Sequence, residues 1–136
     1  FYFVNKSTKS LPNKLNKFLS SFANIKRSLS ENNIDKLTAL YGSGPAYYVF
    51  FNNIVKDTFT QMGFSKKESE LYTNSLMSGS MNLIASNDSL DLLKSIASKG
   101  GTTEAALSQL KKDKVDKSVN NAIQEAYKRS KKILGK

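Results

Sequence analysis

The chain has 136 residues, 39% of them hydrophobic, and carries 21 Lys and Arg against 11 Asp and Glu, a net charge of +10. Cysteine and histidine are absent, which excludes disulfides, thiol catalysis and thiolate zinc sites and removes the usual general base. The basic residues include two arginines, Arg27 and Arg129, so bidentate reading of phosphates or bases is disfavoured. The length favours one modest domain whose chemistry uses hydroxyls, carboxylates, lysines or backbone.

No apolar run approaches the roughly 20 residues that span a bilayer, because the best candidate, residues 46–51, is followed by two asparagines. We therefore expect a soluble, cytoplasmic protein without membrane contact. The chain begins with Phe1 rather than Met and shows no signal-peptide pattern, so its start is expected to be an internal point of a longer chain.

The predicted elements near the start of the chain are short. The opening FYFV suits a strand, and residues 25–29 are a brief extended candidate. Between them, apolar side chains at helical spacing predict an amphipathic helix over residues 13–22. A second short helix follows from about residue 34 and is expected to stop at Gly42.

The most apolar stretch is a predicted helix over residues 44–62, whose hydrophobic side chains cover more than half of its circumference. This apolar surface exceeds what one small domain can easily cover and suggests burial against a second subunit. Gly63 should terminate the helix, and SKKE at residues 65–68 is a capping box for a helix to about residue 86. The positions expected inside that helix's packing face are Leu71, Leu76, Met77, Met81 and Ile84.

Three further helices are predicted in the rest of the chain. Asp88 or Ser89 is expected to cap the first, and Thr102 or Thr103 the second. The last begins after Asp113 and carries apolar side chains at helical spacing to about residue 134. The sequence therefore predicts an all-α protein with about seven helices.

Two glycine-rich segments at helix starts are the candidates for function. GSGPAY, residues 42–47, is interpreted either as a tight turn between helices or as a place where another backbone approaches closely. SKGGTT, residues 98–103, sets a glycine pair among hydroxyls before a helix, which suits a small anion such as a carboxylate. The alternative is a helix C-cap followed by an N-cap. Paired carboxylates, GxGxxG and a Walker loop are absent, so we expect no metal site and no nucleotide site in this chain.

Taken together, these motifs are similar to those of the pyrroline-5-carboxylate reductase family. The segment ENNIDKLTALYGSGPAY, residues 31–47, resembles the opening of the family's C-terminal domain, and SKGGTT resembles its SPGGTT loop. EAYKRS, residues 125–130, resembles its closing EAxxRS helix. Lys99 stands where the family usually has Pro, which adds a positive charge to the loop. The resemblance covers about residues 31–134.

The resemblance implies an NAD(P)H-dependent reduction of 1-pyrroline-5-carboxylate to L-proline, the last step of proline biosynthesis. It implies a Rossmann cofactor domain that this chain would lack, with residues 1–30 as its remnant and linker. Residues 31–136 would form a helical dimerisation and substrate-binding domain of the 6-phosphogluconate dehydrogenase C-terminal-like type. That domain interleaves with its twin into a homodimer, which often assembles further. NADP or NAD would bind to the complete enzyme. Neither cofactor is expected to bind to this chain, which is expected to be inactive on its own.

The resemblance also assigns roles to five residues of the SKGGTT loop. Ser98, Gly100, Gly101 and Thr102 would hold the substrate carboxylate. Thr103 would contact the substrate too and act as the catalytic residue, because its hydroxyl would hydrogen-bond the ring nitrogen as the imine is reduced.

Two other functions stay open at this point. A truncated, non-catalytic dimerisation scaffold would keep the fold and bind no substrate. A binder of nucleic acid or another anionic surface would use the charge of +10, but the lysines are dispersed as on a solvated surface, so we expect no nucleic-acid partner. The residues leave open the origin of the truncation, the preference between NADPH and NADH, and assembly beyond the dimer.

Overall fold

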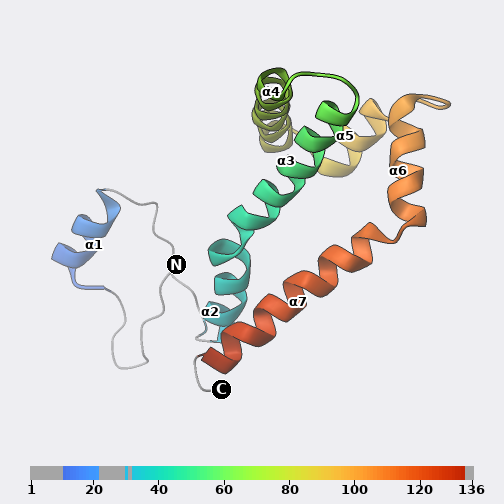
Figure 1. Cartoon of the computed structure of the whole chain (residues 1–136). Coiled ribbons are helices and arrows are strands. Elements are labelled where there is room, and N and C mark those ends of the chain that lie inside the picture. Colours follow the sequence, from blue (N-terminus) through green and yellow to red (C-terminus); the bar gives the residue numbers. More distant parts are fainter. Residues whose placement is uncertain (1–10, 22–29, 31, 134–136) are drawn as a thin grey trace. The chain divides into compact units, whose positions relative to one another are not determined.

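The computed structural model describes residues 11–21, 30 and 32–133, and every regular element among them is a helix (Figure 1). The predicted all-α class is confirmed, as is the number of about seven helices for this part of the chain. The predicted strand at residues 1–4 and the extended segment at 25–29 lie outside the described residues. The elements are α1 (Asn13–Ser20), α2 (Asn32–Leu37), the π-helical turn η1 (Thr38–Gly42), α3 (Gly44–Gln61), α4 (Lys66–Ser86), α5 (Ser89–Ile96), α6 (Thr102–Lys112) and α7 (Val115–Ile133).

The chain divides into two compact units, which are described separately. One comprises Phe1–Gly44 and Asn121–Lys136, and the other comprises Pro45–Asn120. The second unit therefore contains almost all of α3 and the whole of α4, α5 and α6. The domain boundary that we predict between residues 30 and 31 stays a prediction.

Among the described residues, no helix combines the length and hydrophobicity needed to cross a bilayer.

The turn between α3 and α4 follows the sequence signals closely. Gly63 has φ +102° and donates its N–H to the Thr60 carbonyl, while the N–H of Phe64 reaches the Phe59 carbonyl. This pair of bonds is a Schellman motif, and the accompanying apolar contact is present because the rings of Phe59 and Phe64 lie 5.8 Å apart. The predicted termination at Gly63 is confirmed.

A complete capping box then starts α4. The Ser65 hydroxyl accepts from the Glu68 N–H at 3.3 Å, and the Glu68 carboxylate accepts from the Ser65 N–H at 2.9 Å. The Ser65 hydroxyl also donates to the Glu68 carboxylate at 2.6 Å, and this bond first, then the one from the Ser65 N–H, holds the pKa of Glu68 below its ordinary value. The predicted cap of α5 is also present, because the Asp88 side chain accepts from the N–H groups of Leu90 and Asp91.

Small polar residues form the contact between α3 and α4. The hydroxyl of Thr60 lies 3.0 Å from that of Ser69, and Ser69 and Thr73 are fully buried. Phe51, Val55, Leu76 and Met77 line a small hollow beside this contact. Met77 is half-buried, and the other four positions that we expect in the packing face of α4 are exposed, namely Leu71, Leu76, Met81 and Ile84.

The prediction that these side chains form a core is therefore wrong for one copy of the chain. Among the described residues, the one buried hydrophobic side chain is Ala39. The physical reason is that hydrophobic periodicity identifies which face of a helix avoids water, but not which molecule covers that face.

Candidate functional site

The glycine loop, residues 98–103, follows α5 and includes the first two residues of α6. The N–H of Gly101 donates to the Ser98 carbonyl at 2.9 Å, which closes a four-residue turn. Gly100, the third residue of that turn, has φ +73°, a backbone conformation that favours glycine. This is the pattern of a type II turn, in which proline is common at the second position, occupied here by Lys99.

Gly101 is required for a different reason, because the chain approaches it closely. A Cβ at this position would lie 2.6 Å from the Ser98 hydroxyl oxygen and 3.0 Å from the Ser98 carbonyl oxygen. Gly101 is also the N-cap of α6, and no side chain caps this helix. The prediction that Thr102 or Thr103 is the cap is therefore wrong. The tight turn places the cap earlier in the chain, at Gly101, and puts both threonines in the first helical turn.

The start of α6 presents unused hydrogen-bond donors. The first N–H groups of a helix have no intrahelical acceptor. In α6 these are the N–H groups of Thr102, Thr103 and Glu104, and no acceptor for them lies within the described part of the chain. The hydroxyls of Thr102 and Thr103 likewise make no hydrogen bond to any described residue. Thr102 is exposed and Thr103 is half-buried. These donors, at the positive end of the helix dipole, suit an anionic ligand.

The amides of the two glycines are engaged within the chain. Gly101 donates to Ser98, as above, and the N–H of Gly100 donates to the Glu104 carboxylate at 2.6 Å. In this arrangement Gly100 and Gly101 shape the turn, and the donors open to a ligand belong to Thr102 and Thr103. The five predicted site residues are thus brought together by one turn and one helix start, while their contact with a substrate stays a prediction.

Glu104 was missed by sequence reasoning. The signal was present, because a glutamate at the third position of a helix is placed to accept from a backbone N–H just before the helix. We expected the cap at a threonine, which hid this relation.

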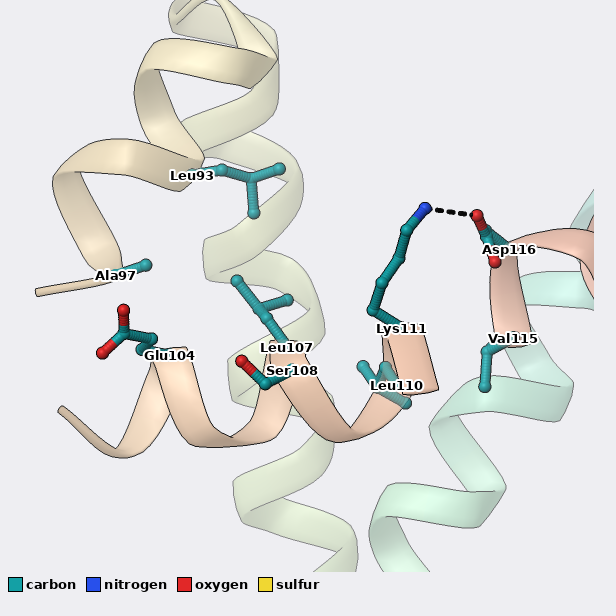
Figure 2. A pocket seen from close by; sticks show the side chains of 9 residues that line it. All are labelled: Leu93, Ala97, Glu104, Leu107, Ser108, Leu110, Lys111, Val115 and Asp116. Carbon is teal, nitrogen blue, oxygen red and sulfur yellow. Dashed lines mark hydrogen bonds and ion pairs between the residues drawn. The ribbon is translucent and has the colours of Figure 1, made fainter. Parts of the chain in front are cut away.

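An open pocket of about 640 Å³ lies beside the glycine loop, and Glu104 also lines it (Figure 2). Its walls come from α5, α6 and the first residues of α7 and are mostly apolar, with Leu93, Leu107 and Leu110 as the largest side chains. At its edge Lys111 and Asp116 form an ion pair of 2.6 Å, and the hydrogen bond from Lys111 lowers the pKa of Asp116. Glu104 thus contacts the glycine loop and also lines this mostly apolar pocket.

These features define an all-helical domain with uncovered apolar faces and a donor-rich glycine loop. Comparisons with known proteins agree on the family to which this domain belongs. The family described as pyrroline-5-carboxylate reductase dimerisation matches residues 31–133. The chain therefore belongs to the pyrroline-5-carboxylate reductase family, and this segment is its dimerisation domain. The family assignment predicted from the three motifs is confirmed.

Individual relatives give the same result. Pyrroline-5-carboxylate reductase 1 of Bacillus subtilis is 32% identical over 108 residues, which cover 78% of this chain and 36% of that protein. The reductase of Staphylococcus epidermidis is 29% identical, over 98% of this chain and 50% of that protein. The crystal structure of Plasmodium falciparum pyrroline carboxylate reductase with NADP bound superimposes with a TM-score of 0.81 at 27% identity, over 91% of this chain and 49% of that one. The chain thus spans about one third to one half of these proteins' length.

The described residues do not fit a dinucleotide site of their own. Such a site places a glycine-rich turn between a strand and a helix, so that the helix N-terminus meets the pyrophosphate. Here Gly42 ends η1 and Gly44 begins α3, and the described elements are all helices.

Proposed function

We propose that this chain is the substrate-binding and dimer-forming part of an NAD(P)H-dependent enzyme that reduces 1-pyrroline-5-carboxylate to L-proline. The observation that carries the proposal is the coincidence of two independent features. The family match covers residues 31–133, and within it the SKGGTT segment folds as a helix start with open donors. In a non-catalytic scaffold water would accept from the same donors, so the two functions differ in whether an anion binds there.

The geometry of the loop supports a division of labour among its residues. The substrate carboxylate would accept hydrogen bonds from the N–H groups of Thr102 and Thr103, assisted by the dipole of α6. The Ser98 hydroxyl lies against Gly101, so it is close enough to the helix start to add a further donor. Gly100 and Gly101 would contribute the shape of the turn.

Thr103 would act on the reacting end of the substrate. Its hydroxyl is half-buried and makes no hydrogen bond to any described residue, so it is available to the ring nitrogen. The charge on that nitrogen changes when the imine is reduced, and a positioned hydroxyl would orient the ring and help to move a proton there. Thr103 is therefore the residue to which we assign the catalytic role.

The domain would work as a homodimer, because α3 is too apolar to stay uncovered. Tyr48, Val49 and Phe50 are 57%, 59% and 62% exposed in one copy of the chain. Contiguous apolar surface of this kind is uncommon on soluble monomers and marks an interface. A second copy is the partner to which the dimerisation family points.

The catalytic proposal is tested in a full-length reductase in which residues 31–133 of this chain replace the matching segment of the Bacillus subtilis enzyme. A hydrogen bond to a charged group contributes about 1.5–3 kcal/mol, so Thr103→Ala should lower kcat/KM roughly 10- to 150-fold. Thr102→Ala keeps its backbone N–H and should lower kcat/KM much less. Equal values for both variants and the parent, or a larger loss for Thr102→Ala, would remove the role given to Thr103.

A further inference from the structure

Glu104 holds an unusual position between the glycine loop and the pocket beside it. Its carboxylate accepts the N–H of Gly100 at 2.6 Å, and the same side chain lines the pocket of Figure 2. Gly100 is the residue whose φ of +73° turns the chain toward α6. The bond therefore joins the residue of the loop that has a positive φ to the helix that follows it.

The capping box of α4 shows why this contact matters. In α4 both the N-cap and the third helical residue contribute side chains, Ser65 and Glu68, to the helix start. In α6 the N-cap is Gly101, which has no side chain, so the third helical residue acts alone. Glu104 also reaches one residue further back, to Gly100 instead of the N-cap. Among the described residues no other side chain ties the glycine loop to α6.

We propose that Glu104 is a positioning residue: its carboxylate fixes the turn at Gly100 and thereby holds the donors of Thr102 and Thr103 in place for an anionic ligand. The consequence for the ligand rests on the function proposed above, whereas the effect on the turn does not. Glu104 does not touch the substrate in this account. It acts through the backbone, by removing the freedom of a glycine whose other conformations would open the loop.

The contrary possibility is that the Glu104 carboxylate competes with the ligand. A negative charge near a carboxylate site repels the carboxylate ligand. The ligand would then have to displace Glu104 as the acceptor of the Gly100 N–H. The two roles predict opposite effects of substitution. Loss of a positioning contact weakens ligand binding, and loss of a competing charge strengthens it.

Two substitutions of Glu104 separate the effect of its side-chain length from the effect of its negative charge. Glu104→Asp keeps the charge, and an acidic residue in the first turn still suits the helix dipole, but the side chain is one methylene too short for Gly100. Glu104→Gln removes the charge and keeps an oxygen that can accept the same N–H at the same distance. Glu68→Asp is the matched control, since it shortens the equivalent glutamate of α4, away from the glycine loop.

The first measurement is amide hydrogen exchange by NMR on the whole 136-residue chain at neutral pH. Exchange of Gly100 should be about threefold to tenfold faster in Glu104→Asp, the range expected for loss of one helix-capping contact. It should stay within about twofold of the parent in Glu104→Gln and be unchanged in Glu68→Asp. Equal exchange of Gly100 in the parent and Glu104→Asp would overturn the proposal.

The second measurement is a titration of the same labelled proteins with L-proline, followed at the amides of Thr102 and Thr103. Affinity should fall about threefold to tenfold in Glu104→Asp and change less than about twofold in Glu104→Gln. Tighter binding by Glu104→Gln with parental binding by Glu104→Asp would identify a competing charge and overturn positioning. If Gly100 exchange follows the expected order but L-proline shifts no loop amide in any protein, Glu104 fixes the turn and the carboxylate role of the loop is wrong.

Discussion

Replacing Phe50 with alanine tests whether a second copy covers α3, and the structure sets the size of the effect. Phe50 is 62% exposed in one copy, with its ring 5.8 Å from that of Phe51. Full burial of a phenylalanine side chain contributes about 2.5 kcal/mol, so 62% of it, about 1.6 kcal/mol, remains for a partner to bury. A symmetric dimer contains the residue twice, which gives about 3 kcal/mol, or a dissociation constant raised roughly 100- to 200-fold.

Sedimentation equilibrium over a range of concentrations measures this change directly. Phe18→Ala is the matched control, because Phe18 is 64% exposed, lies in α1 and is outside the segment that the dimerisation family matches. We expect the parent and Phe18→Ala to be dimers at micromolar concentration and Phe50→Ala to dissociate. A folded monomer for the parent, or the same dissociation constant for both variants, would refute the reasoning.

Three further outcomes are expected. The isolated chain should leave NADPH fluorescence without a saturable change, because it carries no dinucleotide fingerprint; micromolar binding would reveal a cofactor site that we have missed. Lys99→Pro should raise the unfolding free energy by about 0.4–1 kcal/mol in chemical denaturation, because proline suits the second position of the turn; destabilisation would show that the turn has another backbone form. The lowered pKa of Glu68 contributes stability that is present above its ordinary pKa and is lost as pH falls through the lowered one. Glu68→Gln should therefore flatten the fall in unfolding free energy between about pH 5 and pH 3, and an unchanged slope would contradict the link to Ser65.

The parts of the fold that the sequence predicts well are those set by contacts between near neighbours in the chain. The Ser65 and Glu68 capping box, the Asp88 cap and the termination at Gly63 each need only residues within five positions of one another. Such contacts form in the same way whatever surrounds the helix, so the pattern alone predicts them.

The start of α6 was harder to predict, although it is equally local. Ser, Thr, Asp and Asn are the preferred N-caps, and that preference favoured Thr102 and Thr103. The turn closed by Gly101 and Ser98 competes with it, because the close approach of Ser98 to Gly101 leaves no room for a side chain there. Which of two local preferences prevails depends on backbone geometry that residue types alone do not specify. Glu104 was missed for the same reason.

The exposed apolar faces have a consequence for stability. Ordering a residue costs about 1–2 kcal/mol of conformational entropy, and burial of apolar surface is the main term that offsets it. Among the described residues one copy buries a single hydrophobic side chain, Ala39, so that term is small within the chain. If a second copy covers α3 as we propose, most of the stabilising burial occurs on association, and folding and dimerisation become one equilibrium. Unfolding should then depend on protein concentration, and any substitution that weakens the dimer should also loosen the glycine loop, even when it lies far from residues 98–103 in the sequence.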